Sequence, residues 1–208
     1  MEDLFNKYLK MVKETYSEPH RKFHSWNHIQ SGLNLLKNIP DVSLEQKISW
    51  LYHDIIYDIK SNQNEYLSSL KALEDIKLNR DNNKIDVNIV SIIINDTKNH
   101  IPSIKESEII LDIDMSSLAI KNYEDFVALR ILAASEYSSF GKDLVIQGTK
   151  KFISEILNQD KIFYSEYFSY MNEIAFNNLK KYYNEFEKNK NFLDIFENKT
   201  TPKSKIKL

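Results

Sequence analysis

The chain of 208 residues contains no cysteine. Disulfides and thiolate chemistry are therefore excluded, and any metal site must use imidazole, carboxylate and water ligands. No hydrophobic run approaches the roughly 18 residues of a membrane span, and the start "MEDLFNKYLK" lacks the apolar core of a secretory signal. We therefore expect a cytoplasmic protein with no membrane partner.

Glycine and proline are also scarce, with three glycines and four prolines in the chain. So few glycines exclude a Gly-rich phosphate loop and a dinucleotide-binding fingerprint. The small number of helix breakers and the long stretches with a helical period favour an all-α protein. Charge is nearly balanced, with 28 basic and 30 acidic residues, so it gives no indication of a nucleic-acid partner.

Hydrophobic periodicity predicts about eight or nine helices, which form one helical bundle. Ser43 and Gln46 form a capping box that starts the third of them. The segment 85–99 contains the β-branched run "VNIVSIII", but its length and its helical surroundings favour a helix. The predicted segments are 2–16, 25–38, a helix that starts at Ser43, 62–79, 85–99, 106–119, 122–139, 142–158 and 161–190.

The domain organisation is simple, because no linker is long enough to divide the chain. Apolar residues make up 42% of the sequence, which is enough to bury a sizeable core. We expect a single domain over residues 1–192. The polar and basic end, residues 193–208, is expected to be a disordered tail.

Two of the five histidines, His24 and His28, are four residues apart in "HSWNH". They share one helix face if the helix begins by residue 24. Gly32, one turn beyond His28, is expected to leave space near the His28 ring. A lone histidine on a helix is more often structural than a ligand, so the case for a site depends on other residues.

Those residues lie in two apolar segments, "LYHDIIYDIK" and "IILDIDMSSLA". His53 and Asp54 stand inside the first, where a charge carries a desolvation cost unless it is paired. Asp58 is expected one helical turn beyond Asp54, on the same side. Asp112 and Asp114 stand in the second, where acids at a helix N-terminus would be an alternative explanation. The order His, His-Asp, Asp supplies two imidazoles and two carboxylates, which suit a borderline divalent ion.

With these motifs the sequence resembles the HD-domain phosphohydrolase superfamily, all-α enzymes defined by H…HD…D metal ligation. The likeness is to a small bacterial subgroup and covers about residues 16–180. It rests on "EPHRKFHSWNH", "YHDIIYD", "NEYLS", "TKNH" and "DIDM". The resemblance implies a bundle of the HD type, with metal ligands His28, His53, Asp54 and Asp114.

The resemblance implies a metal-dependent phosphohydrolase that acts on a nucleotide or another small phosphate ester. The cofactor would be Mn, Fe, Co, Ni, Zn or Mg, with one ion expected and a second kept open. It would polarise a phosphoryl oxygen and activate water. A catalytically silent regulator that binds a nucleotide or a partner is the main alternative, and oxygen chemistry at two irons is another. The substrate and any homo-oligomer are left open.

Four further residues are substrate-binding candidates under this resemblance: Arg21, His24, Thr97 and His100. Guanidinium matches the geometry of a phosphate, although without the motif Arg21 would be interpreted as an exposed arginine. His100 could instead be a ligand of a second ion.

Two carboxylates are candidates for catalysis, Asp58 and Glu65. Asp58 could orient the attacking water, or it could be a polar residue at a helix end. Glu65 could be a general base, or it could cap the next helix.

The chain departs from the subgroup at three positions that usually hold arginine. They are Ala134, Thr149 and Phe176. The change indicates either a less anionic substrate or the loss of structural ion pairs.

Overall fold

The computed structural model describes residues 2–188, and this part of the chain is all-helical, with nine α-helices, four short 3-10 helices and no strand. The predicted all-α class is confirmed, and each predicted segment contains one α-helix. No helix among the described residues combines the length and the apolarity needed to cross a membrane. The predicted tail, residues 193–208, lies outside the described residues.

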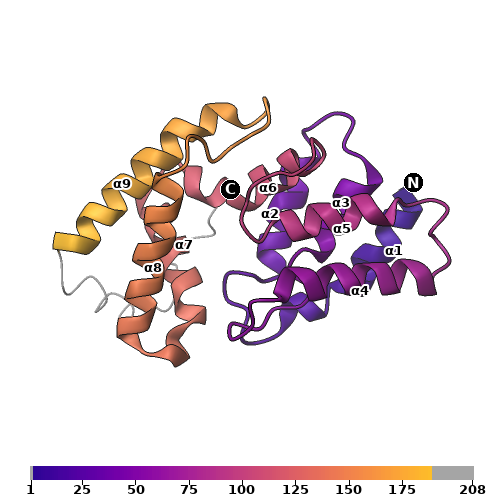
Figure 1. The fold of residues 1–208 in the computed structure, drawn as a ribbon, viewed down its shortest axis with the longest axis horizontal. Helices are drawn as coiled ribbons and strands as arrows, with labels where there is room; N and C mark the ends of the chain where they lie inside the picture. The colour runs from indigo at the N-terminus through magenta and orange to yellow at the C-terminus, as the bar shows by residue number, and fades with distance from the viewer. Residues whose placement is uncertain (1, 189–208) are drawn as a thin grey trace. The chain divides into compact units, whose positions relative to one another are not determined.

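The described residues divide into two compact units, one up to Asp114 and one from Met115 onward. Figure 1 labels the helices of each unit. The prediction of one domain over 1–192, and its assignment to the HD type, stay predictions.

The first unit is built around α3, which packs against α1, α2, α4 and α5. Trp50, Leu51 and Tyr52 on α3 are completely buried, and the Tyr16 hydroxyl donates to the Leu51 carbonyl at 2.9 Å. A helix that is apolar on most of its faces belongs in a core. The elements are α1 (Glu2–Val12), η1 (Thr15–Ser17), α2 (Trp26–Leu36), α3 (Leu44–Tyr52), α4 (Asn64–Leu78), α5 (Val87–Asp96) and α6 (Ser107–Met115).

Side-chain caps start two of these helices. The predicted capping box is confirmed: Ser43 Oγ accepts from the Gln46 amide at 3.1 Å, and Gln46 Oε1 accepts from the Ser43 amide at 2.9 Å. Asp86 caps α5, since its carboxylate accepts from the amides of Asn88 and Ile89. This cap explains why the β-branched run after it forms a helix, as predicted.

Asp81, in the loop between α4 and α5, ties that loop to α1. Its buried carboxylate accepts from Lys7 Nζ at 2.8 Å, from the Tyr8 hydroxyl at 3.0 Å and from Lys84 Nζ at 3.1 Å. Burial alone would raise the pKa of this carboxyl, but the three hydrogen bonds outweigh it and lower the pKa below its ordinary value.

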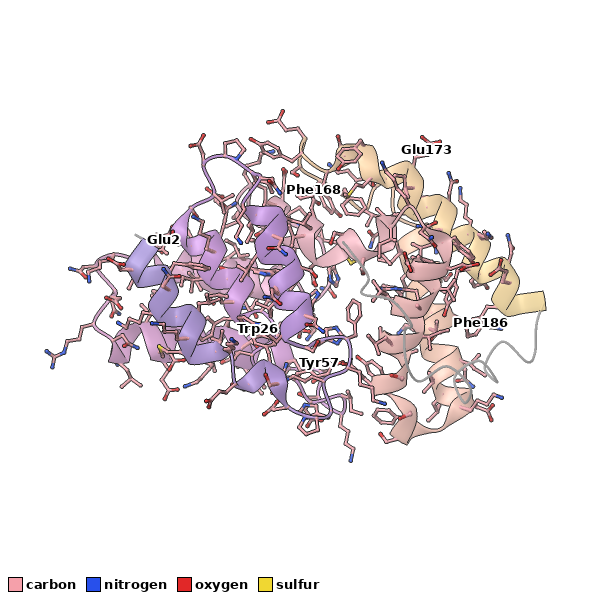
Figure 2. All side chains as sticks on the ribbon, turned by 180° about the vertical axis from the view of Figure 1, so that it is seen from behind. Glu2, Trp26, Tyr57, Phe168, Glu173 and Phe186 are labelled. Atoms are coloured by element: carbon pink, nitrogen blue, oxygen red, sulfur yellow. The ribbon has the colours of Figure 1, made fainter. Side chains whose placement is uncertain are left out.

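The second unit is held together by α9, which packs against α8, α7 and η2. Asn178 on α9 donates to the carbonyls of Leu118 and Ile120, both at 2.9 Å. Figure 2 labels Glu173 near the start of α9 and Phe186 near its end. The elements are η2 (Ser116–Ala119), α7 (Tyr123–Glu136), η3 (Ser138–Phe140), α8 (Lys142–Leu157), η4 (Ser169–Met171) and α9 (Asn172–Lys188).

The prediction of one long helix over 161–190 is wrong in its first third, because α9 begins at Asn172. The Asn172 side chain accepts from the amides of Ile162 and Phe163 and donates to the Phe163 carbonyl. Such side-chain bonds compete with helix formation. The segment before α9 instead buries Phe163 and Phe168.

Gly32 on α2 allows α2, α3 and α6 to approach closely. A Cβ at this position would overlap the Trp50 ring and lie 2.8 Å from Ile113 Cγ2. The expectation that Gly32 leaves space beside His28 is therefore wrong, because the Trp50 indole fills that space.

We predict that Gly32→Ala lowers the free energy of unfolding by about 1–3 kcal/mol, since an added methyl group overpacks this contact. Urea denaturation followed by circular dichroism measures the change. Gly148→Ala is the matched control: no atom would lie within 4 Å of the new Cβ in α8, so this change should stabilise the helix by roughly 0.5–1 kcal/mol. Equal effects of the two substitutions would contradict the prediction.

We predict that Asp81→Asn costs about 1–3 kcal/mol of stability at pH 7, because the buried Tyr8 hydroxyl and the ammonium groups of Lys7 and Lys84 lose a charged acceptor. The pKa of Asp81 is lowered in the folded state, so its contribution is complete above the unfolded value near 3.9. The contribution is lost as the pH falls through the lower folded-state pKa.

The free energy of unfolding of wild type and Asp81→Asn should be measured between pH 3 and pH 7. The difference should be constant down to about pH 5 and should shrink below about pH 4. Asp160→Asn is the control, since Asp160 is exposed and makes no hydrogen bond or ion pair to any described residue. A difference that does not change with pH would refute the proposed role of the Asp81 carboxylate.

Candidate metal centre

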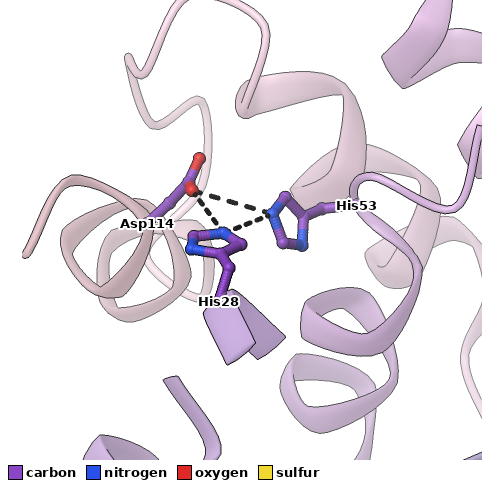
Figure 3. Close-up of side chains that lie close together, drawn as sticks. All are labelled: His28, His53 and Asp114. Atoms are coloured by element: carbon purple, nitrogen blue, oxygen red, sulfur yellow. Dashed lines mark hydrogen bonds and ion pairs between the residues drawn. The ribbon is translucent and has the colours of Figure 1, made fainter. Parts of the chain in front are cut away.

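Three of the predicted ligands converge in the first unit. His28 lies on α2, His53 is the residue after α3, and Asp114 is in the last turn of α6. Figure 3 shows their side chains pointing toward one another. His28 Nε2 lies 3.3 Å from His53 Nε2 and 3.2 Å from Asp114 Oδ1, and His53 Nε2 lies 3.6 Å from Asp114 Oδ1. This group could hold a metal ion.

The spacing of these atoms fits a single transition-metal ion. Ligands at about 2.0–2.2 Å from one ion lie about 3.0–3.6 Å from each other in octahedral or tetrahedral arrangements. The three observed separations, from 3.2 to 3.6 Å, match this range. Two imidazole nitrogens with a carboxylate oxygen are a donor set that suits Zn and its first-row neighbours.

The Trp50 carbonyl determines which nitrogen of His53 faces this cluster. His53 Nδ1 lies 2.8 Å from that carbonyl, which can only accept, so Nδ1 carries a proton in either charge state of the ring. Nε2 is therefore the nitrogen that offers a lone pair when the ring is neutral. The Trp50 ring stacks on His53 at 4.5 Å and lies 5.0 Å from the His28 ring. Its indole N–H donates to the Ile29 carbonyl at 2.9 Å. Sequence reasoning missed Trp50, whose adjacency to the His-Asp pair was the available signal.

Asp54, the fourth predicted ligand, contacts His53 but is not one of the three residues whose ligand atoms are all close to one another. Its Oδ2 lies 2.9 Å from His53 Nε2. Burial would raise the pKa of Asp54, but the charges of His53 and His24 lower it well below its ordinary value. The carboxylate is therefore ionised and available to a cation.

The other cluster members titrate according to their neighbours. Burial lowers the pKa of His28. Burial also acts to lower the pKa of His53, but the carboxylates of Asp54 and Asp114 raise it well above its usual range. Burial would raise the pKa of Asp114, yet its contacts with the rings of His100, His28 and His53 lower it strongly. The centre thus attracts positive charge, which a divalent ion would supply.

His53 and Asp54 belong to a loop rather than to a helix. We call residues 53–58 the ligand loop, since α3 ends at Tyr52. The prediction that Asp58 lies one helical turn beyond Asp54 is therefore wrong. Ser68 Oγ on α4 accepts from the Ile56 amide at 3.0 Å and donates to its carbonyl. Asn64 accepts from the Asp58 amide and donates to its carbonyl.

Arg21 braces the ligand loop from the other side. It donates from Nη1 to the Asp54 carbonyl at 2.7 Å and from Nη2 to the Ile55 carbonyl at 3.0 Å. Its Nε donates to Glu18 Oε2 at 2.9 Å, and only 1% of its side chain is exposed. Interpreting Arg21 as an exposed arginine is therefore wrong. Its predicted contact with a substrate phosphate stays a prediction, and most of its donors already bind the protein.

His24 lies in the bend before α2, which begins at Trp26. His24 and His28 therefore do not share a helix face, although their rings lie 6.0 Å apart. The His24 ring packs 4.5 Å from the Tyr57 ring (Figure 2 labels Tyr57). A substrate contact by His24 stays a prediction.

Thr97 and His100 follow the end of α5. Thr97 is buried, and its hydroxyl donates to the Ile94 carbonyl at 2.7 Å, which is a helix-terminal contact. His100 Nε2 lies 2.9 Å from Asp114 Oδ2. Asp114 stands in the last turn of α6, so acids at a helix N-terminus do not explain this motif. The predicted substrate-binding roles of Thr97 and His100 stay predictions.

The two candidate catalytic carboxylates differ in their surroundings. Asp58 is exposed, and its Oδ1 accepts from the Lys60 amide at 2.9 Å within a turn. Glu65 is half-buried in the first turn of α4 and makes no hydrogen bond or ion pair to any residue that the structure describes. Glu65 does not cap α4, whose N-cap residue is Gln63.

The three positions that lack the subgroup's arginines lie in the second unit. Ala134 is buried on α7, and Phe176 is half-buried on α9. The Thr149 hydroxyl donates to the Val145 carbonyl within α8 at 2.8 Å. Their effect on the substrate stays a prediction.

Comparisons with known proteins add no further assignment to this geometry. No protein-family model, curated protein or solved structure matches the chain.

Proposed function

We propose that this protein is a metal-dependent phosphohydrolase that acts on a nucleotide or another small phosphate ester. The observation that carries the proposal is the convergence of His28, His53 and Asp114, with the tautomer of His53 set by the Trp50 carbonyl. The sequence resemblance supplies the reaction class. A divalent ion held by these residues, with Asp54 beside them, would polarise a phosphoryl oxygen and lower the pKa of a bound water.

Three motif residues that are not ligands form hydrogen bonds to the backbone beside this centre. Arg21, Asn64 and Ser68 bind the backbone of the ligand loop at Asp54, Ile55, Ile56 and Asp58. A ligand carried by a loop needs such support to keep a fixed position. This supports the interpretation of the motifs as parts of one site rather than as separate chance matches.

Glu65 is the better candidate to accept a proton during the reaction. It lies in the same motif as Asn64 and Ser68, both of which bind the ligand loop, while its own carboxylate binds no described residue. The Asp58 carboxylate is already used by the Lys60 amide. We therefore assign the general base to Glu65 and a turn-stabilising role to Asp58.

The first prediction from this proposal concerns the metal. Wild type should bind one divalent ion per chain and release phosphate from at least one member of a panel of nucleotides, alarmones and sugar phosphates. His53→Ala should lose both properties, because it removes a central ligand. Metal content by mass spectrometry and titration calorimetry with Mn²⁺ and Zn²⁺ measure the binding.

His20→Ala is the matched control for this experiment. His20 is exposed, and its Nε2 lies 3.7 Å from Glu18 Oε2, outside the cluster. This variant should keep the metal and the activity of wild type. A wild-type protein that binds neither ion and hydrolyses nothing in the panel would refute the proposed function.

The second prediction separates the two carboxylates. Glu65→Gln should lower kcat by about 10²–10⁴-fold, the usual range for a general base, with the metal affinity unchanged because Glu65 is not a ligand. Asp58→Asn should keep kcat within about 3-fold, since the amide oxygen can still accept from Lys60. Steady-state kinetics on the best substrate of the panel measure both values. The opposite ranking would assign the base to Asp58.

A further inference from the structure

The two oxygens of the Asp114 carboxylate have different partners. Oδ1 faces the cluster, 3.2 Å from His28 Nε2 and 3.6 Å from His53 Nε2. Oδ2 accepts from His100 Nε2 at 2.9 Å, on the other side of the carboxylate. His100 is itself absent from the group of mutually close ligand atoms.

We propose that His100 is a positioning residue, which holds Asp114 so that only Oδ1 is presented to the ion. The proposal rests on the metal centre of the proposed function. A carboxylate whose outer oxygen is bound by a ring N–H cannot turn both oxygens inward without breaking that bond. An ion held here would then receive one oxygen from Asp114 and would keep coordination positions for water and substrate.

The backbone at His100 indicates that this placement is imposed by the fold. Its φ is 52°, in the left-handed region, and it is one of three non-glycine residues with positive φ in the described part of the chain. This conformation costs a histidine conformational energy, so the residue adopts it only where surrounding contacts hold the backbone in place.

Asp96, the last residue of α5, supplies those contacts on both sides of His100. Its carbonyl accepts from the His100 amide at 3.1 Å. Its Oδ2 accepts from the Ser103 amide at 2.8 Å, from Ser103 Oγ at 2.9 Å and from Ser107 Oγ at 2.5 Å. One side chain therefore fixes the loop that carries His100 to the start of α6, the helix that carries Asp114.

These contacts favour positioning over the two roles suggested by sequence. A phosphate oxygen needs a donor, and the N–H of a neutral His100 ring, at Nε2, is already used by Asp114, which leaves Nδ1 only as an acceptor. A ligand of a second ion would need further donors close by, and the described residues contain a single group of three close metal-ligating side chains.

The test uses the left-handed backbone to separate folding from positioning. His100→Gly removes the side chain and its hydrogen bond to Asp114 but also relieves the strain at φ, so the protein should stay folded with a stability close to that of wild type. Its affinity for Co²⁺ should nevertheless fall by about 10–100-fold, the usual effect of losing such an outer partner. Titration calorimetry measures the affinity, and urea denaturation measures the stability.

Arg80→Gly is the matched control. Arg80 also has a positive φ, 58°, and is exposed in the loop after α4, so the same backbone strain is relieved without touching the centre. It should leave the Co²⁺ affinity unchanged. His100→Gln carries an N–H donor as many bonds from Cβ as the histidine Nε2. It should therefore recover part of the affinity that is lost in His100→Gly. His100→Asn tolerates the left-handed backbone and replaces His100→Gly if that variant does not fold.

The outcomes separate the two proposals. Unchanged Co²⁺ affinity in His100→Gly overturns the positioning role while the metal centre stands. A fall in stoichiometry from two ions to one, with the remaining affinity unchanged, shows that His100 is a ligand and also overturns it. A wild-type chain that binds no Co²⁺, Mn²⁺ or Zn²⁺ removes the proposed function, and the role of His100 with it.

Discussion

The centre depends on the hydrogen bond from His53 Nδ1 to the Trp50 carbonyl. The residues that make it are three apart at the end of α3, so the last turn of the helix itself presents the acceptor to the ring. The bond makes Nε2 the free nitrogen and aims it at His28 and Asp114. The Trp50 indole also stacks on His53 and fills the space over Gly32. The packing of the core of the first unit therefore also determines how the His53 ring is oriented.

A second level of support acts on the chain after His53. In the ligand loop the Ile55 amide donates to the Tyr52 carbonyl in one turn at 3.1 Å, and distant side chains supply partners for much of the remaining backbone. Arg21 binds it from the segment before α2, and Asn64 and Ser68 bind it from α4. The same device recurs at Asp96, which braces the loop that carries His100. In both places a polar side chain fixes a loop, and the loop places a residue beside the centre.

Much of the fold and part of the centre followed from local sequence patterns. The capping box at Ser43 is confirmed, because its two partners are three residues apart and need no tertiary contact. The helix over the β-branched run of α5 is also as predicted. The predicted start of α9 was too early, because the Asn172 side chain accepts hydrogen bonds from backbone N–H groups nine and ten residues earlier. The place of Asp58 was misjudged because α3 ends one residue before His53, and a helical period says nothing about where a helix stops.

By itself, the sequence determined the all-α class, the exclusion of thiolate chemistry and the residue types from which a metal centre could be built. Only the tertiary structure decided which of them meet. His28, His53 and Asp114 are separated by 25 and 61 positions along the chain and converge because α2, the end of α3 and α6 are brought together in one unit. It also decided that Arg21 is buried against the ligand loop and that His100 binds the outer oxygen of Asp114. These roles depend on partners more than ten residues away, which no local periodicity or spacing can specify.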